Sequence, residues 1–205
     1  MLLNKFVCQQ ISIGIIILLL ISCSEKKEKI PVLDYNNKAQ LLEMVKKHYN
    51  PDAVFAFGGI FDDTGRETIA VGTEVENNDN WGIKFILLKL EDNEFVVKFE
   101  TDLLDGSFKE SFVNKIKFSS FEDELLYYNS QSYFMGSGGG EIFSYIIDFN
   151  DKLVYYAHLV VDPTTDTSLF ISDNTDNKEI KNFFNLNFKK DYPNLKLVSD
   201  DIFVE

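Results

Sequence analysis

The sequence is poor in cysteine, histidine and positive charge. Its two cysteines, Cys8 and Cys23, both lie within the first 23 of 205 residues, so the rest of the chain has no thiol for a disulfide, a nucleophile or a cysteine–metal site. Neither His48 nor His158 has a neighbour at metal-ligand spacing, and we expect both to be structural. The chain has 20 basic and 33 acidic residues, and its formal net charge of −13 argues against nucleic acid as a partner.

Long apolar runs are also scarce, and the run near the N-terminus is too short to span a membrane. It extends from Ile11 to Ile21, whereas a transmembrane helix needs about 20 apolar residues. The run fits the apolar region of a secretory signal peptide and ends in Leu20-Ile21-Ser22-Cys23, which resembles the lipobox of bacterial lipoproteins. The alternative is an uncleaved N-terminal anchor, but Ser24-Glu25-Lys26 follows the cysteine at once.

The lipobox resemblance implies a type II signal peptide over residues 1–22 and a lipid on Cys23. Acyl chains such as palmitate would then hold the protein on a membrane of the bacterial cell envelope, facing the periplasm or the cell surface, because two or more chains anchor stably. Residues 23–36 are charged at first and contain Pro31, which fits a lipidated tether. Residues 37–205 are long enough for a single domain with its own core.

The pattern of this remaining segment predicts a mainly β domain. Short runs rich in Val, Ile, Phe and Tyr alternate with turns such as Glu91-Asp92-Asn93. We expect an antiparallel meander, a sandwich or part of a propeller, with two peripheral helices. Asn36 or Asn37 can cap the first helix, and Asp176 or Asn177 the second. The expected strands lie near 53–60, 67–75, 82–90, 94–101, 112–119, 124–129, 141–149, 152–161 and 168–172, and the helices end near Tyr49 and Phe188.

Two of the expected strands are apolar on both faces. In 82–90 and in 152–161, side chains at odd and at even positions are mostly aliphatic or aromatic. A strand of this kind fits the centre of a sheet that is covered on both sides, and we expect both strands to be buried in this way.

One hairpin carries a second resemblance. Residues 59–71, Gly-Ile-Phe-Asp-Asp-Thr-Gly-Arg-Glu-Thr-Ile-Ala-Val, resemble the hairpin of FG-GAP and related propeller-like repeats. In that family, spaced aspartates hold calcium inside the turn. Ile60, Thr64 and Thr68 occupy the corresponding positions here, and Asp62, Asp63 and Glu67 stand at the wrong spacing for a calcium cage. We therefore expect the hairpin without a calcium site, and the sequence indicates no metal or other cofactor.

The most unusual stretch is an aromatic segment that runs into glycines. Glycine lets a backbone approach a partner closely, and Tyr and Phe provide rigid contact area, so the stretch has the composition of a ligand-binding loop. The alternative is a long hairpin connection before the next strand. The candidate binding residues are Tyr133, Phe134, Met135, Gly136, Ser137, Gly138, Gly139, Gly140 and Glu141.

The same loop resembles that of envelope lysozyme inhibitors, which insert a Ser-Gly-x-Tyr type loop into a lysozyme cleft. Ser137-Gly138 matches this pattern, although Gly140 stands where the family has tyrosine. The resemblance implies a basic enzyme as the partner, and the acidic composition of the chain would suit such an enzyme.

These observations predict a lipid-anchored envelope protein, not an enzyme, whose β domain binds a protein or glycan partner. One alternative is an inhibitor or immunity lipoprotein that acts against a peptidoglycan hydrolase. Another is an envelope hydrolase that uses paired carboxylates, which are plentiful but concentrated in polar turns, where solvated surface charge is the expected role.

Overall fold

The computed structural model describes residues 29–77, 80–106, 111–130, 133–135, 139–162 and 167–198. The chain divides into two units, Met1–Pro31 and Val32–Glu205, and nearly all described residues belong to the second. Cys23 and the rest of the lipobox lie outside the described residues. Within the segment expected to be a tether, Leu33 is buried and the backbone of Tyr35 lies against Gly58, so the second unit includes residues that precede position 37.

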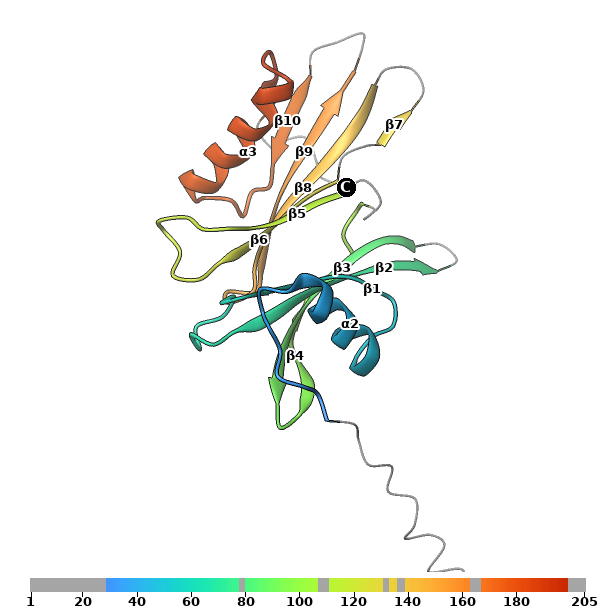
Figure 1. The fold of residues 1–205 in the computed structure, drawn as a ribbon. Helices are drawn as coiled ribbons and strands as arrows, with labels where there is room; N and C mark the ends of the chain where they lie inside the picture. The colour runs from blue at the N-terminus through green and yellow to red at the C-terminus, as the bar shows by residue number, and fades with distance from the viewer. Residues whose placement is uncertain are drawn as a thin grey trace, which may run out of the picture. The chain divides into compact units, whose positions relative to one another are not determined.

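The first four strands form one antiparallel sheet, here called sheet A. Its strand order follows the chain, β1-β2-β3-β4 (Figure 1). Asp92 and Asn93, which connect β3 to β4, both have positive φ, as the two-residue turns of tight hairpins require. The strands are β1 (Ala53–Gly59), β2 (Thr68–Asn77), β3 (Asn80–Glu91) and β4 (Glu94–Glu100).

The other described strands form a second sheet, here called sheet B. Its order is β11-β10-β9-β8-β6-β5, and β7 pairs with the start of β8. The paired strands are antiparallel except β10 and β11, which are parallel because the chain passes through a helix between them. The strands are β5 (Ser111–Ile116), β6 (Leu125–Ser130), β7 (Tyr133–Met135), β8 (Gly139–Asp148), β9 (Leu153–Val161), β10 (Ser168–Ile171) and β11 (Lys196–Val198).

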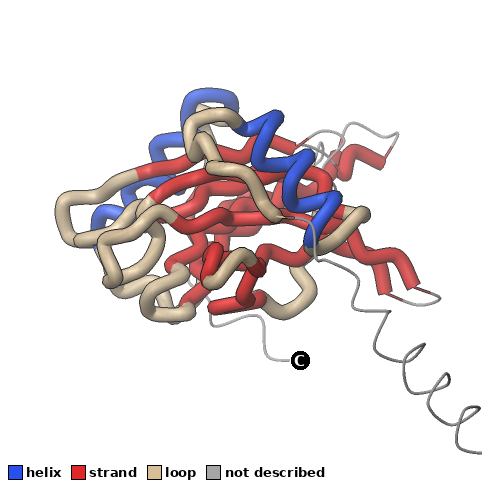
Figure 2. The backbone as a smooth tube through the Cα atoms, turned by 60° about the horizontal axis from the view of Figure 1, so that its bottom comes forward, coloured by secondary structure: helices blue, strands red, loops and turns tan. Residues whose placement is uncertain are grey.

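Both predicted helices form, with side-chain caps at the predicted positions. Asn37 Oδ1 accepts a hydrogen bond from the backbone N–H of Gln40 at 3.1 Å and starts α2 (Lys38–His48). Asn177 Oδ1 accepts one from the N–H of Glu179 at 2.8 Å and starts α3 (Lys178–Asp191). The helices lie on the outside of the strands (Figure 2). Neither described helix is long and apolar enough to cross a membrane.

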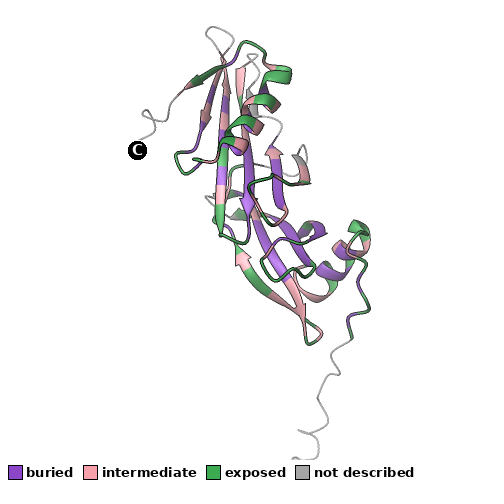
Figure 3. Cartoon of the chain, turned by 90° about the vertical axis from the view of Figure 1, so that its left-hand side faces the viewer, coloured by how far each residue is buried: buried purple, intermediate pink, exposed green. Residues whose placement is uncertain are grey.

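The sheets pack face to face and each carries one helix. Side chains of both sheets, including Phe85 and Tyr128, form one buried cluster between them. A second cluster lies between the opposite face of sheet B and α3, which contributes Ile180, Phe184 and Phe188. Helix α2 packs on β1 of sheet A. Figure 3 shows buried residues along the strands of both sheets. The mainly β fold with two peripheral helices is confirmed, and the sheets form a sandwich.

Strand β9 differs from the prediction on one face. Tyr155, Ala157 and Leu159 are buried beneath α3, as expected for a covered strand. On the inner face, which points to the side of sheet A, Tyr156 remains 43% exposed. This face is therefore only partly covered, and the apolar character of both faces does not mean burial on both sides.

Candidate functional site

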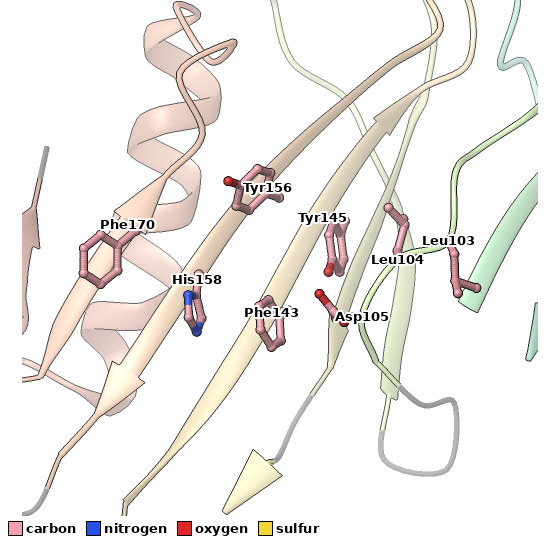
Figure 4. A pocket seen from close by; sticks show the side chains of 8 residues that line it. All are labelled: Leu103, Leu104, Asp105, Phe143, Tyr145, Tyr156, His158 and Phe170. Atoms are coloured by element: carbon pink, nitrogen blue, oxygen red, sulfur yellow. The ribbon is translucent and has the colours of Figure 1, made fainter. Parts of the chain in front are cut away.

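A pocket opens where sheet A leaves the inner face of sheet B uncovered. Its volume is about 420 Å³, which is within the range of small-molecule sites. One wall comes from the segment that follows β4, and the other comes from β8, β9 and β10 (Figure 4). We call it the aromatic pocket, and its described lining consists of Leu103, Leu104, Asp105, Phe143, Tyr145, Tyr156, His158 and Phe170.

The aromatic wall is built by cross-strand pairing. Phe143 of β8 stands opposite His158 of β9, which in turn stands opposite Phe170 of β10. The rings of Phe143 and His158 stack with centroids 4.4 Å apart and an interplanar angle of 8°. Because side chains on one face of neighbouring strands lie side by side, the antiparallel register produces a continuous row of three rings.

A second row runs parallel to the first. Tyr145 of β8 stands opposite Tyr156 of β9, with ring centroids 6.5 Å apart. Tyr145 also stacks on Tyr128 of β6, at 5.8 Å and an interplanar angle of 12°, so the row continues into the buried cluster between the sheets. The pocket is thus the exposed end of an aromatic layer whose other end belongs to the core.

The opposite wall depends on close backbone contacts. Leu104 exchanges two backbone hydrogen bonds with Ile83 of β3, at 2.8 and 2.9 Å. A Cβ atom on Gly82 would lie only 2.4 Å from the Leu104 carbonyl oxygen. Gly106 has a φ of +139°, and a Cβ there would lie 2.3 Å from the Tyr128 hydroxyl. Two glycines therefore allow residues 103–105 to lie against both sheets.

The charged groups at the pocket are mainly acidic. Asp105 is exposed, and Figure 4 shows its carboxylate and the Tyr145 hydroxyl pointing toward one another. Glu141, on the same face of β8 as Phe143, places Oε2 3.3 Å from Nε2 of His158. The His158 side chain is 14% exposed and that of Glu141 is 50% exposed, so the carboxylate lies at the rim. Among the described lining residues there is no lysine or arginine.

Comparison with known proteins gives no relative. No protein-family model, no curated protein and no solved structure matches the chain. Functional inference therefore rests on the sequence motifs and on the chemistry of the aromatic pocket.

The described ends of the glycine-rich stretch proposed as a binding loop pair with each other as antiparallel strands. The backbone of Tyr133–Met135 forms β7 and pairs with the start of β8, with Tyr133 opposite Glu141, Phe134 opposite Gly140 and Met135 opposite Gly139. Gly136, Ser137 and Gly138 lie outside the described residues. Glu141 is the candidate residue that the structure brings to the aromatic pocket, through its contact with His158.

Sequence reasoning missed the residues of the pocket itself. His158 was expected to be a structural residue, and the structure places its ring in the aromatic wall between Phe143 and Phe170. The available signal was the aromatic and aliphatic character of both faces of the strand expected at 152–161, which is β9. This pattern was interpreted as burial on both sides because a sequence does not show how far the other sheet extends.

In the segment 59–71, Asp62 makes a local hydrogen bond and Asp63 makes one to a distant residue. Asp62 Oδ1 accepts from the backbone N–H of Thr64 at 3.2 Å, and the N–H of Asp63 donates to Asn150 Oδ1 at 3.2 Å. Across the described part of the chain, no three His, Cys, Asp or Glu side chains are placed to hold a metal ion.

Proposed function

We propose that the protein is a lipid-anchored binding protein of the bacterial envelope, and that a group of its protein or glycan partner enters the aromatic pocket without being chemically changed. The observation that carries this proposal is the pair of aromatic rows on the partly uncovered face of β8, β9 and β10. Water contact with aromatic surface is unfavourable, so a ligand that covers these rings gains free energy from their burial.

The lining favours binding over catalysis. Most of the described lining residues are aromatic or aliphatic, and Asp105 is the one carboxylate among them. Glycoside hydrolysis by paired carboxylates needs two carboxyl groups that face each other across the scissile bond, about 5–10 Å apart. Glu141, the other carboxylate near the pocket, is instead directed at His158 on the rim. A pocket with apolar walls and few polar groups is instead typical of a site that orients and retains a ligand.

The anchor follows from the lipobox resemblance at Leu20–Cys23. A Cys23→Ser variant should lose metabolic labelling by fatty acid and leave the membrane fraction. Persistent labelling in this variant would overturn the proposed lipidation. A Cys8→Ser variant is the matched control and should be labelled like the wild type, because its cysteine precedes the cleavage site.

The pocket is tested with small probes and the full chain in a polyoxyethylene detergent, which carries neither a sugar nor an ammonium group. Glucose, N-acetylglucosamine, choline and acetate are titrated while the methyl NMR signals of Leu103 and Leu104 are followed. At least one probe should shift these signals, and Phe143→Ala should abolish the shift by removing a ring from the wall. Absence of any shift with all four probes would overturn the pocket as the binding site.

A further inference from the structure

We propose that the aromatic pocket binds an alkylammonium group, which is the positively charged end of a small ligand or of a lysine-type side chain. The inference rests on the proposed binding function and names the chemical class of its ligand. It is carried by the combination of aromatic rings, two carboxylates and an absence of lysine and arginine among the described lining residues.

The lining rings differ in orientation and in how much of each ring is open. The planes of His158 and Phe170 are inclined by 35°, and those of Tyr145 and Tyr156 by 42°. Phe143 and His158 stack at 8° and each covers one face of the other, whereas Tyr156 is 43% exposed and offers ring surface to a ligand. The faces of aromatic rings carry partial negative charge and attract cations. Phe, Tyr and Trp rings that surround a common space are the usual binding site for an alkylated ammonium group.

Two carboxylates also attract a cationic ligand. Asp105 lies in the wall opposite the aromatic rows, and Glu141 lies at the rim beside His158. A cationic ligand is attracted by both carboxylates, and an anionic ligand is repelled by both. The formal net charge of −13 for the whole chain favours the approach of cations further.

A neutral sugar fits the lining less well. Sugar rings present hydroxyl groups around their edge, and each buried hydroxyl needs a hydrogen-bonding partner. The described lining offers the Asp105 carboxylate, two tyrosine hydroxyls and His158, whose ring stacks on Phe143 and whose Nε2 faces Glu141. The methyl groups of a quaternary ammonium need no hydrogen-bonding partners and can lie directly on the rings, whereas a primary ammonium would donate to a carboxylate such as that of Asp105.

The decisive test compares choline with 3,3-dimethylbutan-1-ol, its uncharged analogue of the same shape. Calorimetric titration of the full chain in the polyoxyethylene detergent should give at least about tenfold tighter binding for choline, as expected for a cation surrounded by aromatic rings. Titration with Nα-acetyl-lysine amide distinguishes the source of the group, because tighter binding of this compound than of choline would indicate a protein side chain.

Two variants connect this preference to the pocket, and two others serve as controls. Asp105→Asn should weaken choline binding about fivefold or more and leave binding of the neutral analogue unchanged, since it removes charge and retains shape. Tyr156→Leu should weaken choline binding by a similar factor. Asp52→Asn and Trp81→Leu, which change an exposed carboxylate and an exposed ring outside the described lining, are the controls and should bind like the wild type. Asp105, Tyr156, Asp52 and Trp81 are all exposed, so the four variants should fold.

Two results overturn the inference and are distinguishable from failure of the binding function. Equal affinity for choline and the neutral analogue would show that the charge is irrelevant. Pocket binding by glucose or acetate without choline would show a different ligand class, while the binding function itself would stand. If none of these compounds shifts the Leu103 and Leu104 signals, the proposed function fails as well.

Discussion

Ile60 and Glu124 exchange two hydrogen bonds and thereby join the two sheets. The backbone N–H of Ile60, which follows β1, donates to Glu124 Oε2 at 3.0 Å. The backbone N–H of Glu124, which precedes β6, donates to the Ile60 carbonyl oxygen at 2.9 Å. Lys115 Nζ lies 3.3 Å from the same Oε2. Glu124 thus joins the end of a sheet A strand to sheet B at two points, through its carboxylate and through its backbone N–H.

Glu124→Ala should destabilise the domain by about 1–2 kcal/mol, because a charged acceptor is removed from a backbone donor and from Lys115. The value is measured by urea denaturation, which gives the free energy of unfolding. Glu43→Ala removes an exposed carboxylate from α2 and is the control, with an expected change below about 0.5 kcal/mol. An equal decrease in the free energy of unfolding in the two variants would contradict a specific role for the Ile60–Glu124 pair.

Gly106 is required by the wall of the aromatic pocket. Its φ of +139° is unfavourable for residues with a side chain, and a Cβ would collide with the Tyr128 hydroxyl. Gly106→Ala should therefore lower the free energy of unfolding by about 2–4 kcal/mol, because the backbone is strained and a buried ring is displaced. Probe binding in the pocket should weaken at the same time, because residues 103–105 are displaced.

Gly65→Ala separates backbone strain from the collision. Gly65 also has a positive φ, +62°, but a Cβ there meets no atom within 4 Å. The free energy of unfolding of this variant should fall by only about 1 kcal/mol, because only the left-handed backbone conformation is unfavourable. The variant should bind pocket probes like the wild type. If Gly106→Ala is no more destabilising than Gly65→Ala, the close contact with Tyr128 has no structural importance.

Local sequence signals predicted most of the fold. Asn37 and Asn177 cap helices because their side chains reach backbone donors two or three residues away, and Asp92-Asn93 forms a tight turn by its own conformational preference. The described segment β11 was not predicted, since it has three residues and depends on parallel pairing with β10.

The pocket could not be predicted because it depends on contacts between distant segments. The exposure of Tyr156 is determined by where sheet A ends, and the position of Asp105 is determined by the contact of Leu104 with Ile83. The sequence did indicate Glu141, as part of a glycine-rich stretch, but it did not indicate the partner His158 on the next strand.

Glu179 makes the stability of the domain depend on pH in the acidic range. Hydrogen bonds from the hydroxyl groups of Ser119 and Ser120 and from the Ser120 backbone N–H lower the pKa of Glu179 from 4.5 to about 2. The ionised carboxylate therefore stabilises the folded state above pH 4.5, and this contribution is lost as the pH falls through 4.5 toward 2.

Glu179→Gln should accordingly lower the melting temperature at pH 7, and the difference from the wild type should narrow as the pH falls from 5 to 3. Thermal unfolding followed by circular dichroism measures both effects. Glu43→Gln provides the control for removal of one exposed charge. A difference between Glu179→Gln and the wild type that stays constant over this pH range would rule out titration of Glu179 as its origin.

Asp148 should have the opposite effect on the pH dependence of stability, because its contribution decreases as the pH rises. Asp148 is 2% exposed at the end of β8, and its Oδ1 accepts from the backbone N–H groups of Asn150 and Asp151, both at 3.0 Å. Within the described structure, Oδ2 is buried without a hydrogen-bond partner. Burial raises the pKa of Asp148 above 3.8 despite these hydrogen bonds, and the charge of Asp151 raises it further.

A raised pKa means that the folded protein binds this proton more tightly than the unfolded chain does. The contribution of Asp148 to stability is therefore most favourable below pH 3.8 and decreases as the pH rises through the pKa of the folded state. Asp148→Asn cannot titrate, so its stability relative to the wild type should improve between pH 3 and pH 7. Chemical denaturation at both pH values measures this change, and contributions that do not depend on pH cancel in the comparison. The same comparison with Asp52→Asn corrects for the loss of one exposed negative charge. If the corrected difference is the same at both pH values, the buried carboxylate of Asp148 does not carry the penalty that its missing hydrogen-bond partner implies.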